Sequence, residues 1–363
     1  MSADDAEALP EFRDALLAWY GQVARPMPWR NSADPYRIWL SEIMLQQTRV
    51  DQVLPYFERF VAAFPDLPAL ASAPLDEVLR HWEGLGYYSR ARNLHAASRA
   101  MAEHHAGRIP STYEAIVALP GIGPYTAAAV LSIAYGRPHA AVDGNVIRVL
   151  SRLFVVTDDV GAGRTRAHLQ RLADTLIDPR RPGDYNQALM ELGATVCIPR
   201  SPRCGACPIA LWCRACAEGT QENFPVKTKK GPTPHYHHVV GIVRNEAGEY
   251  LIHQRHEENM LGGMWTFPGG RLEAGESVEA ACRRLLLEDF DIDALAESPF
   301  HRLSHAYSHF KITLNACDCQ NARPRDTPGD RRLKWVAAEA LTEHAFDRAS
   351  RKLIDAIRLR DAS

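Results

Sequence analysis

Apolar residues in the first 220 positions recur at the three- and four-residue spacing of amphipathic helices. The stretch from Ile38 to Phe64 shows this pattern most fully, with apolar residues at 50, 53, 54, 57, 60 and 61. Prolines and glycines separate it from further helical stretches at 74–82, 89–104, 112–119, 125–135 and 145–154. We therefore predict that residues 1–220 form an all-α domain.

The pattern changes after residue 220. Residues 221–235 contain three prolines and three lysines and lack periodicity, which is typical of an interdomain linker. Beyond them, strand-like sequence at 237–244, 250–254, 310–314 and 333–336 accompanies a helical stretch at 277–289. The turn signal at Asn245–Gly248 predicts a hairpin between the first two strands. The fold class is therefore multidomain, with the helical domain followed by an α+β domain over residues 236–363.

Composition agrees with two globular domains and excludes other classes. Hydrophobic residues make up 46% and charged residues 24% of the 363 residues, so disorder is not the dominant state. No run of 18 apolar residues predicts a membrane span, and the acidic N-terminal sequence lacks the apolar core of a secretory signal. We expect a cytoplasmic protein. The formal net charge of −2 gives no indication of a nucleic-acid partner.

Lysine is distributed unevenly. Of the 42 basic residues only 6 are lysine, and the first of these is Lys227. Residues 1–226 contain 22 arginines and no lysine. Codon bias explains this distribution, but its consequence is chemical, because the helical domain has no side-chain amine.

Four cysteines have the spacing C-x6-C-x2-C-x5-C, at Cys197, Cys204, Cys207 and Cys213. The pairs Cys204/Cys207 and Cys213/Cys216 lie too close in sequence for a zinc ribbon, which needs a longer separation. Three thiolates within ten residues and one upstream favour a [4Fe-4S] cluster over zinc. Cys216 remains an alternative to Cys213 as the fourth ligand.

Two further features lie between helices. The sequence LPGIG at 119–123 places Gly121 and Gly123 in a tight turn before a helix, which suits phosphate binding but also a simple helix connection. Asp143 begins another helix, and Glu42 lies near the start of an apolar one. Each carboxylate alone is typical of a helix terminus.

The order of these features resembles the helix-hairpin-helix DNA glycosylases that carry a terminal iron–sulfur cluster. Within them the chain is most similar to the MutY family of adenine DNA glycosylases. The resemblance covers the whole chain and depends on six segments that occur in order: PWR at 28–30, WLSEIMLQQT at 39–48, GLGYYSRARNLH at 84–95, LPGIGPYTA at 119–127, VDGNV at 142–146 and NQALMELGA at 186–194.

The resemblance implies base-excision repair of double-stranded DNA by removal of adenine mispaired with 8-oxoguanine or guanine, by a monomeric enzyme. Glu42 would protonate adenine and Asp143 would stabilise the positive sugar, supported by Tyr125 and Asn145. Relatives that also cleave the strand carry a lysine where Tyr125 stands. Because the domain has no lysine, the family's hydrolytic reaction without lyase activity is expected.

The resemblance also implies the contacts with DNA. The adenine must be flipped out of the duplex, and Gln47 and Tyr87 match residues that wedge into the stack. Core packing is the alternative role of Tyr87. Trp29, Arg30 and Glu191 match positions near the adenine pocket. Two arginines beside the cluster ligands, Arg200 and Arg203, are candidates for phosphate contacts.

Residues 267–292 of the second domain resemble a Nudix box, with Gly270, Glu276, Arg284, Leu286, Glu288 and Asp289 in place. Asp289 stands where the box has Glu, Leu285 replaces one acidic metal ligand and Asp291 replaces a glycine. Hydrolysis of nucleotides is therefore not expected, while Glu288 and Asp289 remain candidates for a weak metal site. In the family this domain recognises 8-oxoguanine. The matching loop is Tyr307, Ser308 and His309, and the Ser-His pair at 304–305 is an alternative that lacks the aromatic residue.

Three other functions compete with this interpretation. An endonuclease III-like enzyme for oxidised pyrimidines is disfavoured by Tyr125 and the second domain. A Nudix pyrophosphatase is disfavoured by Leu285. A non-catalytic DNA-binding scaffold is disfavoured by the presence of both Glu42 and Asp143.

Overall fold

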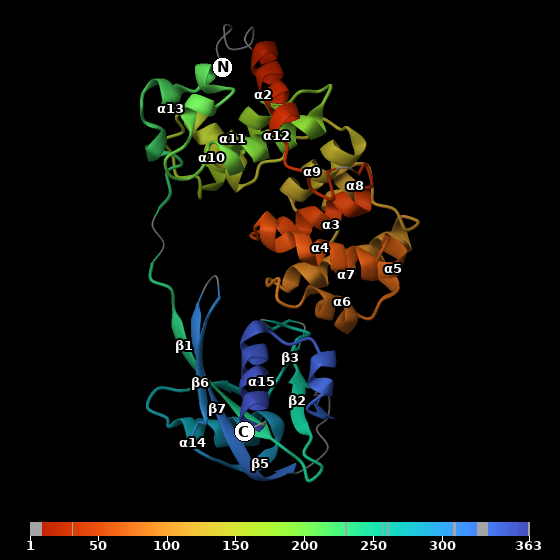
Figure 1. Ribbon diagram of the computed structural model, residues 1–363, viewed down its shortest axis with the longest axis vertical. Coiled ribbons are helices and arrows are strands. Elements are labelled where there is room, and N and C mark those ends of the chain that lie inside the picture. The colour runs from red at the N-terminus through yellow and green to blue at the C-terminus, as the bar shows by residue number, and fades with distance from the viewer. Residues whose placement is uncertain are drawn as a thin grey trace. The chain divides into compact units, whose positions relative to one another are not determined.

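The computed structural model describes residues 9–30, 32–228, 231–256, 258–259, 261–307, 310–324 and 333–361. The chain divides into two compact units (Figure 1). The first unit combines the residues up to Ala71 with those from Ala96 to the linker. The second combines Ser72–His95 with the residues from Gly231 onwards. The sequence pattern does not indicate that Ser72–His95 belongs with the second unit.

Helices build the first unit. They are α2 (Leu9–Val23), α3 (Pro35–Leu45), α4 (Val50–Ala63), α5 (Leu67–Ser72), α8 (Tyr113–Val117), α9 (Pro124–Tyr135), α10 (Gly144–Leu153), α11 (Gly163–Leu176), α12 (Pro182–Thr195) and α13 (Arg214–Ala217). Helix α6 (Leu75–Trp82) lies in the second unit, and α7 (Ser89–His104) runs from the second unit into the first. Short 3₁₀ turns occur at Cys204–Ala206, Ala210–Trp212 and Gln221–Asn223. No helix in the described ranges is both long and apolar enough to cross a bilayer.

The predicted continuous helix from Ile38 to Phe64 is wrong. Helix α3 ends at Leu45 and α4 begins at Val50. Between them Gln47 has a φ of 57°, in the left-handed region that a right-handed helix cannot contain. The apolar spacing continues across this break, so periodicity alone does not reveal it.

Local signals explain several helix termini. Asp34 caps α3 by accepting a hydrogen bond from the Tyr36 N–H at 3.0 Å, with Pro35 in the first turn. Helix α9 begins at Pro124 after the LPGIG turn and ends at Gly136, whose φ is 62°. Asp143 caps α10 through the Val146 N–H at 2.7 Å. The same carboxylate is thus a helix cap and a candidate catalytic group.

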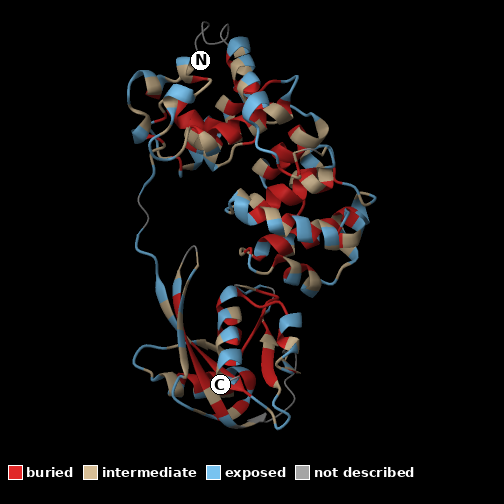
Figure 2. Cartoon of the chain, viewed as in Figure 1, coloured by how far each residue is buried: buried red, intermediate tan, exposed pale blue. Residues whose placement is uncertain are grey.

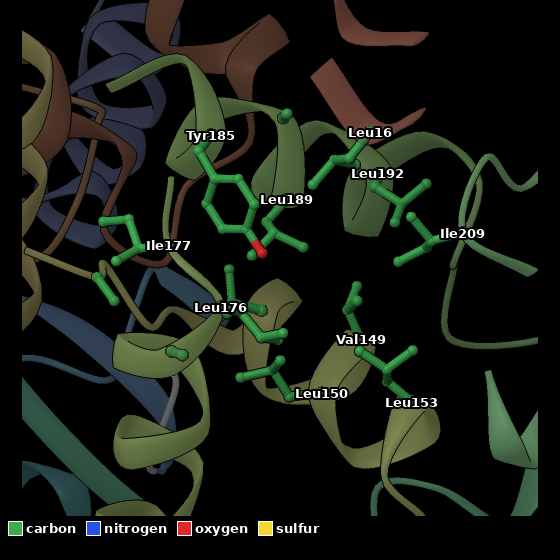
Figure 3. Close-up of a cluster of buried hydrophobic side chains, with 14 of the residues drawn as sticks. Leu16, Val149, Leu150, Leu153, Leu176, Ile177, Tyr185, Leu189, Leu192 and Ile209 are labelled. Carbon is green, nitrogen blue, oxygen red and sulfur yellow. The ribbon is translucent and has the colours of Figure 1, made fainter. Parts of the chain in front are cut away.

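A hydrophobic core holds α2, α10, α11 and α12 together (Figure 3). Leu16 of α2, Val149 and Leu150 of α10, and Leu189 and Leu192 of α12 are almost fully buried in it. Burial of leucine or valine contributes about 1.5–3 kcal/mol each. This core fixes the position of α10, whose first turn carries Asp143.

The described part of the second unit contains two sheets. The first has the order β4 (Gly269–Arg271), β1 (His235–Val243), β7 (Lys311–Pro324) and β5 (Ile292–Ala296), with β6 (His301–Ala306) also paired to β7. The second has the order β3 (Trp265–Thr266), β2 (Tyr250–Gln254) and β8 (Leu333–Val336). The β1/β7 pair is parallel, whereas β1/β4, β5/β7 and β6/β7 are antiparallel.

The predicted hairpin forms only as a turn. The Gly248 N–H donates to the Asn245 carbonyl at 2.9 Å, and one bridge joins Arg244 to Tyr250. Strands β1 and β2 then separate into different sheets.

Alternate residues of β1 and β7 bury two faces of the first sheet. Helix α14 (Val278–Phe290) shares one apolar cluster with Val239 and Val243. Helix α15 (Arg348–Asp361) shares another with Val240 and Ile242. Figure 2 shows buried residues concentrated along the strands of the second unit. Alternation along a strand predicts this division.

Candidate functional site

The catalytic candidate Glu42 lies on α3, which packs against α9. Its side chain is buried, and the Tyr125 hydroxyl of α9 donates a hydrogen bond to Glu42 Oε2 at 2.6 Å. The same hydroxyl lies 3.3 Å from the Met190 Sδ of α12. Three helices that are far apart in sequence therefore enclose one carboxyl group.

Burial raises the pKa of Glu42 to about 7, because an apolar environment disfavours its charged form. The Tyr125 hydrogen bond and the Arg30 charge oppose this shift, while the negative charge of Asp143 adds to it. A carboxyl group with a pKa near neutrality can hold a proton and donate it in the physiological range. Interaction with Asp143 also indicates that the two carboxyl groups lie close together.

Asp143 has a more polar environment. Its Oδ1 accepts the Val146 N–H, and its Oδ2 accepts the Asn145 side-chain amide at 2.9 Å. Asn145 Oδ1 in turn accepts a hydrogen bond from Arg148 Nη2 at 2.9 Å. Burial raises the pKa of Asp143, but the hydrogen bonds and the Arg148 charge favour the ionised form. The structure thus brings Glu42, Tyr125, Asp143 and Asn145 together.

Arg30 and Glu191, the adenine-pocket candidates, form an ion pair beside this group. Arg30 Nη2 lies 2.7 Å from Glu191 Oε2, and Arg25 binds both oxygens of the same carboxylate. Glu191 is 1% exposed at the side chain, yet these hydrogen bonds lower its pKa despite burial. Trp29 is buried and packs edge-on against Phe57, with the ring centroids 5.0 Å apart. Arg25 was not predicted from the sequence, because no motif pairs it with Glu191.

The wedge candidates Gln47 and Tyr87 share a backbone feature. Both have left-handed conformations, with φ values of 57° and 50°. Such conformations cost about 1 kcal/mol or more for residues with a Cβ and concentrate at functional sites. Gln47 is exposed and Tyr87 is half-buried, with the Arg90 guanidinium 5.2 Å from the centroid of the Tyr87 ring.

The LPGIG turn has the form expected of a hairpin between helices α8 and α9. Gly121 has a φ of 72°, and the Ile122 N–H donates to the Leu119 carbonyl at 3.2 Å. Gly121 and Gly123 are exposed, and a Cβ built at Gly123 meets no atom within 4 Å. The surface at Gly123 is therefore open to a ligand.

The cysteine-rich loop encloses a small cavity. Cys197, Cys204, Cys207, Cys213 and Cys216 all line it, together with Arg152 and Gln221. Among the described residues no three metal-binding side chains converge at the spacing of a single ion. Several thiols around one cavity instead fit the larger [4Fe-4S] core, in which each ligand binds a different iron. Both Cys213 and Cys216 line the cavity, so it does not show which of them is the fourth ligand.

Two arginines on α10 connect to this loop and were not identified from sequence. Arg152 is 1% exposed and donates hydrogen bonds to Cys197 Sγ at 3.3 Å and to the Ile198 carbonyl at 2.8 Å. Arg148, one turn earlier, donates to the Cys197 carbonyl at 2.7 Å and to Asn145. Their i, i+4 spacing on one helix face was the available signal.

The Nudix-like segment lacks one of the acidic ligands of a Nudix metal site, at Leu285. Arg284 and Glu276 form a two-pronged ion pair with both distances at 2.8 Å, while Glu288 and Asp289 are exposed. Leu285 is buried in the cluster under α14 and lies 2.9 Å from a Cβ built on Gly270. Asp291 ends α14 with a φ of 54°, a conformation that aspartate tolerates in place of glycine.

Tyr307 follows β6 and is held on the second unit. Its hydroxyl donates to Asp347 Oδ1 at 3.1 Å, and its ring stacks on Phe310 with centroids 4.7 Å apart. Ser308 and His309 lie outside the described residues. The alternative pair, Ser304 and His305, lies within β6 and is paired with β7.

Two family matches agree with this division. Residues 40–174 match the HhH-GPD superfamily of base excision DNA repair proteins, and residues 239–356 match the NUDIX domain. The HhH-GPD segment contains Glu42, Tyr125 and Asp143.

Known proteins extend these matches. The adenine DNA glycosylase of Mus musculus is 36% identical over 91% of this chain and 75% of its own length. That of Buchnera aphidicola subsp. Acyrthosiphon pisum is 31% identical over 84% of this chain and 86% of its own length. A solved thermostable thymine-DNA glycosylase is 30% identical with a TM-score of 0.55, over 60% of this chain and all of that protein. The chain therefore belongs to the adenine DNA glycosylase family of base-excision-repair enzymes that act on DNA.

Proposed function

We propose that this glycosylase removes adenine paired with 8-oxoguanine or guanine by hydrolysis alone and leaves an abasic site. One observation carries the proposal. The Glu42–Tyr125 pair combines a carboxyl group of raised pKa with the neighbouring Asp143, whose polar partners favour its charge. Two carboxyl groups in different environments are what N-glycosidic hydrolysis requires.

Glu42 acts as the general acid in this mechanism. Its proton moves to adenine N7, and the C1′–N9 electron pair leaves with the base. The deoxyribose becomes oxocarbenium-like, and the Asp143 carboxylate stabilises it across a short distance or bonds to it transiently. Water then adds to C1′ and loses a proton, which completes the hydrolysis. General acid catalysis of this kind contributes about 10²–10⁴-fold.

Tyr125 and Asn145 position the two carboxyl groups. The Tyr125 hydroxyl stabilises the Glu42 carboxylate after proton transfer. Asn145, held by Arg148, keeps Asp143 Oδ2 hydrogen-bonded and charged. Residues 1–226 offer no side-chain amine to the sugar, because they contain no lysine. A Schiff base, and with it efficient lyase chemistry, is therefore not expected.

The surrounding residues engage the duplex in this proposal. Gln47 and Tyr87 wedge into the base stack, and the Gly121–Gly123 turn meets a phosphate through backbone N–H groups. Trp29, Arg30 and Glu191 form the adenine side of the pocket. Tyr307, with Ser308 and His309, contacts the 8-oxoguanine. One chain supplies all of these residues, so the proposed enzyme needs no second copy to complete its site.

A [4Fe-4S] cluster bound by Cys197, Cys204, Cys207 and Cys213 completes the proposal. When bound, the cluster supplies a rigid cross-link within the loop. The chain's own contribution is the Arg152 and Arg148 hydrogen bonds that tie this loop to α10. Iron and sulfide analysis of protein purified without oxygen tests this assignment. Four irons per chain in the wild type, retained in Cys216→Ser and lost in Cys213→Ser, support Cys213 as the ligand; the reverse pattern identifies Cys216.

A panel of duplexes tests the reaction. The enzyme is expected to release adenine from A:8-oxoguanine and A:G duplexes and nothing from thymine glycol duplexes or free 8-oxo-dGTP. Release of thymine glycol or hydrolysis of the nucleotide would overturn the assignment.

Borohydride trapping tests the absence of lyase chemistry. The wild type and Tyr125→Phe should form little covalent adduct with DNA, while Tyr125→Lys places an amine at the same position and serves as the positive control. Wild-type trapping as strong as that of Tyr125→Lys would contradict hydrolysis alone.

A further inference from the structure

The second unit contains a contact between Glu83, which follows α6, and the beginning of α15. Arg351 Nε lies 2.5 Å from Glu83 Oε1, and Arg351 Nη2 lies 2.8 Å from Oε2. Glu83 also accepts the Phe346 N–H at 3.3 Å. Both charged side chains are less than one quarter exposed, so this two-pronged pair is better ordered than a surface ion pair.

Two further hydrogen bonds hold Ser72–His95, the segment that contains Glu83. Gln254 Nε2 of β2 donates to Asp76 Oδ1 at 2.6 Å. Arg92 Nη1 of α7 donates to the Gly262 carbonyl at 2.7 Å. Residues 76, 83 and 92 are thus held at three separate places on the α+β part of the unit. Contacts at three places fix the orientation of this segment as well as its distance from the α+β part.

The wedge candidate Tyr87 lies four residues after Glu83, in a constrained turn. Gly84, Gly86 and Tyr87 all have positive φ values, of 91°, 79° and 50°. The Gly86 carbonyl accepts hydrogen bonds from Trp82 Nε1 at 3.1 Å and from Arg90 Nη2 at 3.0 Å. The backbone between Glu83 and Tyr87 is therefore constrained, so that a shift of Glu83 also moves Tyr87.

The same turn of α15 also holds Tyr307. Asp347 accepts the Tyr307 hydroxyl and, at 2.9 Å, the Ala349 N–H at the start of the helix. Its other oxygen accepts the Ser350 hydroxyl at 2.7 Å. Phe346, Asp347 and Arg351 thus connect both tyrosine-bearing segments within six residues.

We propose that this first turn of α15 fixes the spacing of the Tyr87 turn and Tyr307, so that the two tyrosines together distinguish 8-oxoguanine from guanine opposite the adenine. Glu83 and Arg351 are positioning residues for this selection. The inference rests on the proposed function, which assigns Tyr87 to the base stack and Tyr307 to the 8-oxoguanine. Specificity is a difference between two affinities, and a displacement of about 0.5 Å at a recognition group is enough to reduce it.

Single-turnover excision from A:8-oxoguanine and A:G duplexes tests the inference in the full-length enzyme. Glu83→Gln and Arg351→Gln should each lower the ratio of the two rates about tenfold, the scale of one lost positioning contact. The A:G rate should stay within about twofold of the wild type, because the catalytic groups are untouched. The double variant should lose no more than the worse single variant, since the two side chains act as a pair.

Asp318→Asn is the matched control. It breaks the two-pronged Arg360–Asp318 pair at the other end of α15, where the distances are 2.5 and 3.1 Å and both side chains are about one third exposed. This variant should keep the wild-type ratio with a comparable change in melting temperature. A fall in its ratio equal to that of Glu83→Gln would show a general effect of destabilisation and overturn the proposal.

The remaining outcomes separate the two levels of inference. A wild type that releases adenine equally from both duplexes contradicts the proposed 8-oxoguanine preference itself. A wild type that prefers 8-oxoguanine, with variants that keep this preference, contradicts only the role of Glu83 and Arg351. If the glutamine variants do not fold, Arg351→Lys, which keeps the charge but not the two-pronged geometry, should lower the ratio about threefold. An unchanged ratio in Arg351→Lys then overturns the proposal.

Discussion

Two buried glutamates in the helical unit have opposite electrostatic properties. Glu42 has a neutral hydroxyl as its hydrogen-bond partner, and its pKa rises to about 7. Glu191 is at least as buried, but two arginines bind it and its pKa falls. Burial alone therefore does not make a general acid. The partner decides whether the buried carboxyl group holds a proton or a charge.

The largest expected effect is on Glu42 and its neighbour. Glu42→Gln removes the proton donor and should slow adenine excision by about 10³-fold or more, and Asp143→Asn should do the same by removing the anion beside the sugar. Single-turnover excision measures the loss. Duplex binding by gel shift is the control and should stay within about threefold, because both changes keep the side-chain size and leave the contacts with the rest of the duplex in place. Wild-type turnover by either variant would refute its catalytic role.

The next effect is a pH dependence. Glu42 must be protonated to act, so excision by the wild type should decline as the pH rises through about 7. Tyr125→Phe removes a hydrogen bond that favours the charged form, so the pKa of Glu42 should rise and the decline should move to higher pH. The maximal rate should fall about tenfold, because the carboxylate formed by proton transfer loses its donor. A shift to lower pH would contradict this role of Tyr125.

A smaller effect is expected from the arginine that supports Asn145. Arg148→Lys keeps the positive charge but cannot reach the Asn145 side chain, the Gly193 carbonyl and the Cys197 carbonyl together. Excision should slow about threefold to tenfold while the iron content stays unchanged. A variant that keeps both full activity and full iron content would show that Asn145 needs no support.

The helices and their termini were largely predictable from the sequence, because apolar spacing, prolines and Asp34-type caps are local signals. Helices α6, α7 and α9 agree with the predicted stretches within a residue or so. The break at Gln47 was not predictable, since a left-handed backbone leaves no trace in the apolar pattern. Contacts between distant residues were also hidden. Arg25 with Glu191, and Glu83 with Arg351, are separated by more than 160 residues and follow no motif.

The candidate site likewise has features that were predictable from the sequence and features that were not. The resemblance to known glycosylases pointed to Glu42, Tyr125 and Asp143, which the structure brings together. It also implied that Glu42 holds a proton and that Asp143 carries a charge. It did not indicate the surroundings that act on them, which are burial and Arg30 at Glu42 and burial and Arg148 at Asp143. Residue identity is a local property, whereas a pKa belongs to the folded surroundings.

The sharpest contrast between the two glutamates is expected in the stability of the folded chain. The pKa of Glu42 is higher in the folded than in the unfolded chain, so stability falls as the pH rises from 4.5 to about 7. Glu42→Gln should remove a penalty on the order of 3 kcal/mol at pH 8 and raise the melting temperature by about 5 °C or more.

The pKa of Glu191 is lower in the folded chain, so its stabilisation is present above pH 4.5 and is lost as the pH falls through the folded value. Glu191→Gln should therefore lower the stability at pH 8 by about 2 kcal/mol, less than a fully buried pair because Arg25 is partly exposed. The decline of excision at alkaline pH should stay in place in Glu191→Gln, because Glu42 keeps its proton. Calorimetry of both variants at pH 5 and pH 8 measures the contrast, and shifts of the same sign at pH 8 would show that burial, not the partner, sets the charge of each glutamate.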